Sequence, residues 1–277
     1  MKFLIFSFAA LLLPLLFTSC EQCGGSASSS DSDSVASVAE VDTVPAFTDL
    51  VFTVHEVEFS MIAVNGGSFS MGGTPEQEGD SWDEEQPVHT VNLSDFHIGQ
   101  TEVTWALWQA VMGADRRHEQ DGSLPVTDVS WDDCQTFIAK LNSLTGSEFR
   151  LPTEAEWEYA CRGGQRTTGY KFGGSDNAED VANFWANGEG QLKPIMTKHA
   201  NELGLYDMSG NVFEWCQDYY APYPATTQYD PQGPDSGDER VYRGGSWDMS
   251  AWSCRVSARA CGHPDQKGNN IGLRLAL

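Results

Sequence analysis

The stretch "RLPTEAEWEYACRGG", residues 150–164, predicts a short helix with both ends defined. Thr153 and Glu156 stand three positions apart, which is the spacing of a capping box, where each side chain accepts a hydrogen bond from the other residue's backbone N–H. Gly163 follows the last helical residues and readily adopts the left-handed conformation that ends many helices. We therefore expect a helix between Thr153 and Gly163.

Two other segments predict helices. The first follows Thr104 and runs through "WALWQAVM" to Gly113. The second begins at Ser130 in "SWDDCQTFIAKLNSLTG", where Ser130 is placed to cap the helix and Asp133 lies near its positive end. Apolar residues of this second segment, Cys134 among them, recur at helical spacing. We therefore expect Cys134 to be a core residue and not a nucleophile.

The strands expected from the sequence are short. "LVFTVHEVEF" (50–59) alternates as a half-buried strand does, and "MIAVNGGSFSMGG" (61–73) predicts a strand, an Asn-Gly-Gly turn and a return strand. "VHTVNLSDFHIGQTEVT" (88–104) is again strand-like. The chain after the third helix is dense in Gly, Pro, Asn and aromatic residues, so we expect long loops held by turns and aromatic packing.

Residues 1–20, "MKFLIFSFAALLLPLLFTSC", predict a secretory signal peptide. The apolar run is too short and too close to the start for a membrane-spanning helix followed by a domain. The ending Phe-Thr-Ser-Cys resembles a bacterial lipoprotein cleavage box, in which Cys20 becomes lipidated. The alternative is an ordinary signal peptide cut elsewhere, which would leave Cys20 and Cys23 as plain thiols.

Residues 21–45 are rich in Ser, Gly, Ala and Asp and contain no basic or aromatic residue. Such a segment buries too little apolar surface to offset its ordering entropy, so we expect a flexible linker. The remaining residues, 46–277, are enough for one large domain. These boundaries predict a protein of the bacterial cell envelope, lipid-anchored, periplasmic or surface-exposed, that meets the membrane only through its anchor.

The composition is strongly acidic, with 40 Asp and Glu against 16 Lys and Arg and a net charge of -24. This balance argues against nucleic acid as a partner, because nucleic-acid binding needs clustered basic residues. We expect the acidic run "EQEGDSWDEEQ" (76–86) to be a solvated loop. A second reading is that some of these carboxylates bind calcium.

The domain contains five cysteines, namely Cys134, Cys161, Cys216, Cys254 and Cys261. A compartment outside the cytoplasm favours disulfides, but an odd number cannot all pair. We therefore expect at least one free or externally partnered thiol.

The sequence as a whole resembles the sulfatase-modifying-factor family, whose founding member is the formylglycine-generating enzyme. The blocks that carry the resemblance appear in family order: "GGSFSMG", "TEVTWALWQAVM", "VTDVSWDDCQTFIAKLN", "RLPTEAEWEYACRGG", "NELGLYDMSGNVFEW", "RVYRGGSW" and "NNIGLRLAL". The resemblance implies an α+β, C-type-lectin-like domain with short strands, about three short helices and long loops. Fold alone does not decide function, which depends on the site.

The family's oxidases convert a sulfatase cysteine to formylglycine with a copper-binding cysteine pair, since two thiolates select Cu(I). In the corresponding signature of this chain, Met249 takes the place of the first cysteine and Ser250 that of the following histidine. Cys254 occupies the second cysteine position, and Val256 replaces an arginine. The resemblance therefore leaves Cys254 as the catalytic candidate if the protein is an enzyme, and it predicts that copper is not a cofactor.

The tail also resembles the variable proteins of diversity-generating retroelements, in which GGSW and NIGFRL-type segments frame diversified positions. Here "RGGSW" and "NNIGLRL" would be the frame. A non-diversified paralogue with the same frame is the alternative. The expected ligand-binding residues are Asp248, Met249, Ser250, Trp252, Ser253, Ser257, Ala260, Cys261 and His263.

Asn211 and Glu214 in "GNVFEW" match a position where the family places calcium, and Asp218 is a further candidate oxygen ligand. The hypothesis favoured by the sequence is an envelope-anchored lipoprotein whose domain binds a protein or surface ligand. The alternatives are a formylglycine-generating oxidase and a structural subunit of an envelope assembly for gliding or secretion.

Overall fold

The computed structural model describes residues 47–77, 82–114 and 121–277. The expected signal peptide 1–20 with Cys20, and the expected linker 21–45, lie outside these residues. The chain divides between Val44 and Pro45, so everything described below belongs to the second unit. No helix of the described residues is long and apolar enough to cross a bilayer.

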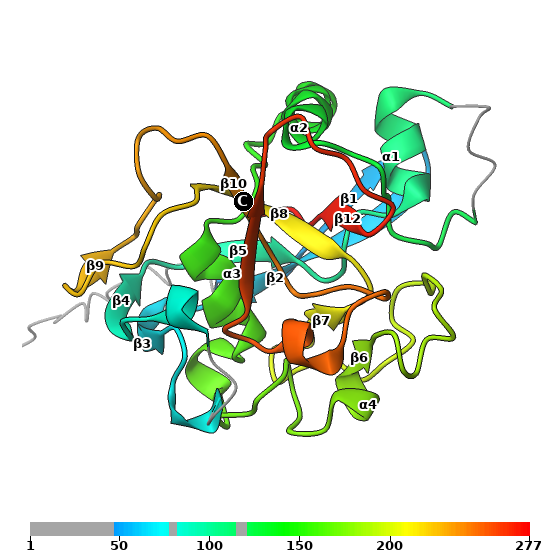
Figure 1. Cartoon of the computed structure of the whole chain (residues 1–277). Helices are drawn as coiled ribbons and strands as arrows, with labels where there is room; N and C mark the ends of the chain where they lie inside the picture. Colours follow the sequence, from blue (N-terminus) through cyan, green and yellow to red (C-terminus); the bar gives the residue numbers. More distant parts are fainter. Residues whose placement is uncertain (1–46, 78–81, 115–120) are drawn as a thin grey trace, which may run out of the picture. The chain divides into compact units, whose positions relative to one another are not determined.

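Short strands form four small sheets in the described residues (Figure 1). The first has the order β1 (Leu50–Val54), β2 (Val57–Val64), β5 (Phe96–Gly99). The second has the order β3 (Gly67–Met71), β4 (His89–Leu93), β9 (Gln228–Tyr229). The third, which carries the C-terminal site, has the order β11 (Arg259–Gly262), β10 (Arg240–Arg243), β8 (Phe213–Tyr219), β12 (Ile271–Leu273). The fourth pairs β6 (Ala182–Asn183) with β7 (Ser209–Gly210).

The three expected helices are confirmed as α1 (Trp105–Met112), α2 (Trp131–Thr145) and α3 (Glu154–Cys161). Each begins at its expected cap, because the side chains of Thr104, Ser130 and Thr153 accept hydrogen bonds from backbone N–H groups of the first turn. A fourth helix, α4 (Ala178–Val181), is a single turn. Together with the short strands, these helices give the mixed α+β fold that the sequence predicted.

The strands differ from the expectation in two places. The alternating run 50–59 is a hairpin and not one strand, because His55 and Glu56 both have positive φ and join β1 to β2. The run 61–73 is not a hairpin, because β2 and β3 belong to different sheets. The backbone at Gly66 passes so close to Leu93 that a Cβ would lie 2.2 Å from the Leu93 carbonyl oxygen. This close approach directs β3 onto β4.

Strand β8 separates the two main parts of the core. Phe213 and Trp215 pack into a cluster with α1, α2, β1 and β12, in which Cys134 is fully buried as expected. The alternate residues Glu214 and Asp218 face α3, where they hydrogen-bond to Trp157 and to the backbone of Glu154. The face of β8 toward α3 therefore carries two buried acids, of which Glu214 pairs with Arg274 from the C-terminal segment.

Candidate functional site

The candidate site is the C-terminal segment after β10, where the sequence resembles the oxidase signature. Gly244 and Gly245 have φ values of +96° and +74°, a conformation that glycine adopts without strain. A Cβ on Gly245 would lie 2.7 Å from the Cys254 sulfur. The Gly-Gly turn therefore lets the short 3₁₀ turn Ala251–Cys254 pack directly against the backbone of residue 245.

Hydrogen bonds fix the start of this segment. The Ser246 hydroxyl donates to Asp248 (2.7 Å), and the Asn270 amide donates to the same carboxylate (3.0 Å). The Trp247 indole N–H donates to the Asn269 carbonyl (3.2 Å), and the Trp247 side chain is half-buried. Residues 246–248 are thus tied to the segment 269–270 that precedes β12.

The 3₁₀ turn itself rests on a small apolar cluster with Phe172 and Phe184. On its outer side Ser250 is exposed and Trp252 is half-buried. The Trp252 ring lies against the exposed Trp82 ring, with 3.7 Å between centroids, and the Arg255 guanidinium lies 4.5 Å from the Trp252 ring. Two tryptophans from distant parts of the sequence therefore flank the turn.

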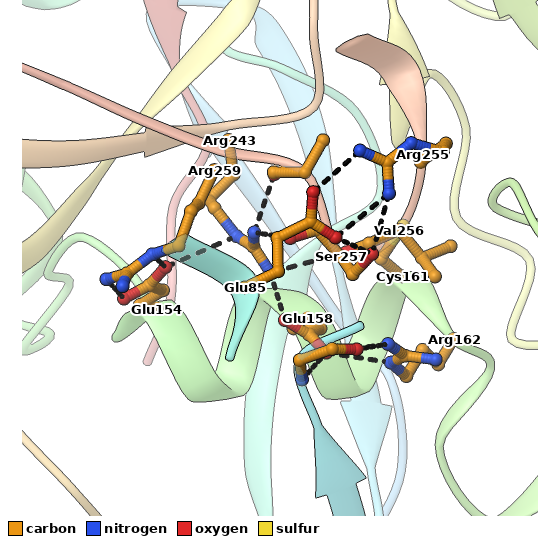
Figure 2. A network of polar contacts seen from close by, with 12 residues as sticks. Glu85, Glu154, Glu158, Cys161, Arg162, Arg243, Arg255, Val256, Ser257 and Arg259 are labelled. Carbon is orange, nitrogen blue, oxygen red and sulfur yellow. Dashed lines mark hydrogen bonds and ion pairs between the residues drawn. The ribbon is translucent and has the colours of Figure 1, made fainter. Parts of the chain in front are cut away.

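Figure 2 shows the buried ion pair between Glu85 and Arg255, the residue that follows the turn. Arg255 and Glu85 are both fully buried, and two guanidinium nitrogens of Arg255 donate to the two carboxylate oxygens of Glu85 at 2.9 and 2.6 Å. The Ser257 hydroxyl donates to the same carboxylate (2.5 Å). Burial alone would raise the pKa of Glu85, but the hydrogen bonds from Arg255 and Ser257 lower it overall.

Two further arginines of the site are paired in the same way (Figure 2). Arg243 forms an ion pair with Glu158 on α3. Arg259 donates two hydrogen bonds, of 2.8 and 2.6 Å, to the Glu154 carboxylate. Glu158 also binds Arg162 (2.8 Å). Charged groups on α3 and on the C-terminal segment therefore neutralise one another in a shared network, which is the condition for burying them.

The acidic run 76–86 is not simply a solvated loop. Glu85 is fully buried against Arg255, and Glu76 accepts hydrogen bonds from Arg162 and Thr74. The expectation was wrong for these two residues because the buried arginines of the fold need carboxylates, and this run supplies them. The sequence signal for this role was the set of arginines in apolar surroundings near the C-terminus, each of which requires an acid from elsewhere.

The two sulfur positions of the oxidase signature lie in different surroundings. Met249 packs against the cluster of α1 and α2, whereas Cys254 is fully buried in the cluster with Phe172 and Phe184. Burial raises the pKa of the Cys254 thiol to about 12, so the metal-binding thiolate is disfavoured. A thioether and a buried neutral thiol in separate clusters do not fit the two-thiolate Cu(I) site that the family implies.

The five cysteines of the described residues are all free thiols. Cys134, Cys161 and Cys216 are buried like Cys254, and Cys261 is partly exposed on the edge strand β11. The Cys261 thiol donates to Glu239 (3.3 Å), and burial together with this acid raises its pKa to about 11. The environment of each thiol therefore disfavours the reactive thiolate.

The expected ligand-binding residues lie in two exposed or half-buried groups, except for one residue that is buried. Asp248, Met249, Ser250, Trp252 and Ser253 are exposed or half-buried around the 3₁₀ turn. Ala260, Cys261 and His263 are partly or fully exposed on β11 and just after it. Ser257 is the exception: it is fully buried because its hydroxyl completes the Glu85–Arg255 pair, so it does not lie on an exposed face as expected.

Asn211 and Glu214, the expected calcium ligands, already have partners. Glu214 accepts hydrogen bonds from Arg274 (2.7 Å) and Trp157 (2.6 Å). The side chain of Asn211 donates to Glu102 and accepts from Asn183 and from the backbone of residue 193. Asp218 contacts Glu154 instead. As placed, these residues do not fit a calcium site, and within the described ranges no group of three His, Cys, Asp or Glu is arranged to hold a metal.

Comparison with known proteins agrees with the fold and with the sequence blocks. The family model described as "Sulfatase-modifying factor enzyme 1-like domain" matches residues 50–277. The chain belongs to this family. A sulfatase-modifying-factor domain therefore accounts for nearly the whole of the described residues.

The relatives of this domain have names that state different roles. A formylglycine-generating enzyme from Streptomyces coelicolor is 31% identical over 78% of this chain and 88% of its own length. A chaperone protein LppX from Paenibacillus barcinonensis is 30% identical over 79% and 89%. Among solved structures, Treponema denticola variable protein 1 superposes with a TM-score of 0.73 at 32% identity, covering 82% of this chain and 98% of its own. Similarity at this level is thus shared by an enzyme, a chaperone and a variable protein.

Proposed function

We propose that the protein is an envelope-anchored lipoprotein whose sulfatase-modifying-factor domain binds a protein or surface ligand. The observation that carries this proposal is the state of the signature sulfurs, because Met249 and the buried Cys254 do not form a two-thiolate copper site. The family's oxidase activity depends on that pair. A domain that keeps the fold but lacks the pair is better suited to binding.

The proposed binding face consists of Asp248, Met249, Ser250, Trp252 and Ser253 around the 3₁₀ turn. The turn is held by the Gly-Gly bend, the Ser246–Asp248–Asn270 hydrogen bonds and the Arg255–Glu85 pair. Side chains on the outer side of a turn fixed in this way can change at small cost in stability. The likeness to Treponema denticola variable protein 1 supports a diversified face, and a neighbouring reverse-transcriptase gene with a near-copy of the tail would establish diversification.

Site-specific photocrosslinking in cells tests the binding face. A benzoylphenylalanine replaces the exposed Ser250, and a matched control places the same probe at the exposed Ser143 on α2. We expect an ultraviolet-dependent adduct from position 250 and none from position 143. Equal adducts from both positions, or no adduct from position 250, would contradict the proposed face.

The lipid anchor has its own test. Cys20→Ser removes the proposed acylated residue, so it should move the protein from the membrane fraction to the soluble fraction and abolish labelling with a fatty-acid analogue. Cys23→Ser is the matched control and should change neither result. Membrane association that survives in the Cys20→Ser variant would exclude Cys20 as the anchor.

A further inference from the structure

A cavity of about 330 Å³ lies next to the Arg259–Glu154 pair, and its lining includes none of the residues of the proposed binding face. Small-molecule sites begin at about this size, roughly 300–1,000 Å³. Its lining includes Tyr219 and Tyr223 together with two buried acids, Glu154 and Asp218. Four prolines of the segment 222–234 also line it, namely Pro222, Pro224, Pro231 and Pro234.

The two acids that line the cavity are not equivalent. Glu154 is neutralised by Arg259 and also accepts a hydrogen bond from the Tyr223 hydroxyl (3.1 Å). Asp218 is only 5% exposed, accepts one hydrogen bond from the Glu154 backbone N–H (2.8 Å), and forms no ion pair with any described residue. The cavity thus contains a buried carboxylate with no described positive group in ion-pair contact with it.

The surroundings of Asp218 explain why none of the side chains that the structure describes forms an ion pair with it; Arg240 acts on it only at longer range. Glu154 and Glu156 on α3 carry the same charge as Asp218. Arg259 is committed to Glu154, and the Arg240 guanidinium is stacked 3.4 Å from the Tyr219 ring. His89 on β4 lines the same cavity, with its Nδ1 3.2 Å from the Pro87 carbonyl oxygen.

We propose that this cavity binds a small organic ammonium ion of the arylalkylamine class, in which an alkyl chain separates the amine from the ring. The ammonium group would pair with the Asp218 carboxylate, and the carbon body would lie against Tyr219, Tyr223 and the prolines. A cation at this point supplies a close positive charge for the buried Asp218 carboxylate. This site goes beyond the proposed binding face and does not depend on it.

The loop that covers Asp218 is built for close approach. Gly233 has a φ of +72°, and a Cβ on it would lie 2.8 Å from the Asp218 Cβ. The backbone of residue 233 therefore reaches the carboxylate only because it lacks a side chain. The prolines on either side restrict the loop, so little ordering entropy remains to be lost when a ligand enters.

Protonation links the site to pH. Burial and the neighbouring Glu154 raise the pKa of Asp218 to about 7, so the carboxylate is mostly ionised at pH 8 and mostly protonated at pH 6. A cationic ligand prefers the ionised form. Its affinity should therefore fall about tenfold from pH 8 to pH 6, while a neutral ligand of the same shape shows no such change.

Titration calorimetry with tyramine tests the proposal, and its neutral isostere tyrosol, in which a hydroxyl replaces the ammonium group, is the ligand control. We expect tyramine to bind at pH 8 at least tenfold more tightly than tyrosol and to weaken about tenfold at pH 6. Asp218→Asn keeps the acceptor for the Glu154 N–H and should abolish the preference for tyramine. The matched charge control is Asp235→Asn, an exposed residue of the same loop, which should behave as wild type.

Three results would overturn the proposal: no tyramine binding up to millimolar concentration, equal binding of tyramine and tyrosol, or unchanged tyramine binding by Asp218→Asn. Circular dichroism in the near ultraviolet shows whether the Asp218→Asn variant is folded. If it is not, a crystal of the wild-type protein soaked with tyramine decides, since the amine must lie within hydrogen-bond distance of Asp218 or the proposal is wrong.

Discussion

Arg255 is the residue that holds the proposed binding face to the rest of the domain. Its charge is fully buried and is compensated by Glu85, a residue 170 positions away in the sequence. Removing one partner of such a pair leaves an uncompensated buried charge, which costs far more than the pair itself contributes. The order of the 3₁₀ turn therefore depends on an acid from the run 82–86.

Glu85→Gln should lower the free energy of unfolding by about 3–5 kcal/mol, because the Arg255 charge stays buried without its partner. The control is Lys267→Met, which breaks an exposed pair with Asp133 and should cost no more than about 1 kcal/mol. Urea denaturation of both variants measures the two values. A cost for Glu85→Gln as small as that for Lys267→Met would show that the buried pair does not support the fold.

Cys254 should be unreactive in the folded protein. Because burial raises its pKa to about 12 and excludes reagents, we expect iodoacetamide at pH 8 to modify Cys261 before Cys254, and Cys254 only after unfolding. Mass spectrometry of peptides from native and guanidinium-treated protein measures the modification at each thiol. Rapid native labelling of Cys254 would contradict the burial described here.

At the scale of elements, the Gly-Gly turn is the feature that places the 3₁₀ turn. Gly245→Ala should destabilise the protein by about 2–4 kcal/mol, since it adds a left-handed alanine and a Cβ 2.7 Å from the Cys254 sulfur. Gly146→Ala has nearly the same φ, +71°, but nothing within 4 Å of its Cβ, so it should cost only about 1–2 kcal/mol. Thermal and urea denaturation compare the two. Equal decreases in the free energy of unfolding would mean that the close contact with Cys254 does not contribute to the cost of Gly245→Ala.

The elements also show what could be predicted from the sequence. The three longer helices were predictable because Thr104, Ser130 and Thr153 cap them through local hydrogen bonds. The departure of β3 from β2 was not, because it depends on the close approach of Gly66 to Leu93, 27 positions away. The burial of Glu85 and Ser257 was missed for the same reason, since an ion pair across 170 residues leaves no periodic signal.

The Asp218 cavity lay outside the sequence prediction as well. The tyrosines were noticeable as aromatic residues near the end of the chain, and Asp218 was noticeable as a candidate metal ligand. The sequence does not show that α3 brings Glu154 next to Asp218 and leaves the latter with no ion pair to a described residue. The unpaired Asp218 carboxylate can be identified only once the packing of β8 against α3 is known.

At the scale of the whole molecule, stability should rise on mild acidification. Burial raises the folded pKa of Asp218 to about 7 and that of Asp207 to about 6, well above the ordinary value for aspartate. A raised folded pKa means that stability is fully present at low pH and is lost as pH rises through the folded pKa. Glu85 has the opposite shift, so its contribution is lost only below about pH 4.

We therefore expect the free energy of unfolding to rise from pH 8 to a maximum between about pH 4 and 5, with Asp218 alone contributing about 3 kcal/mol of the difference from pH 8. Asp218→Asn should flatten this part of the profile, and Asp235→Asn should leave it unchanged. Urea denaturation between pH 4 and pH 8 gives the curves. A wild-type profile that falls steadily from pH 8 to pH 5.5 would contradict the assignment.

The central claim is that this sulfatase-modifying-factor domain binds a ligand and does not oxidise cysteine. The most direct measurement supplies the protein with Cu(I) and oxygen and follows a Cys-x-Pro-x-Arg peptide by mass spectrometry, with a formylglycine-generating enzyme as the positive control. Because Met249 and the buried Cys254 do not form a two-thiolate site, we predict no conversion of the peptide cysteine. Conversion to formylglycine that disappears in the Cys254→Ser variant would contradict the claim.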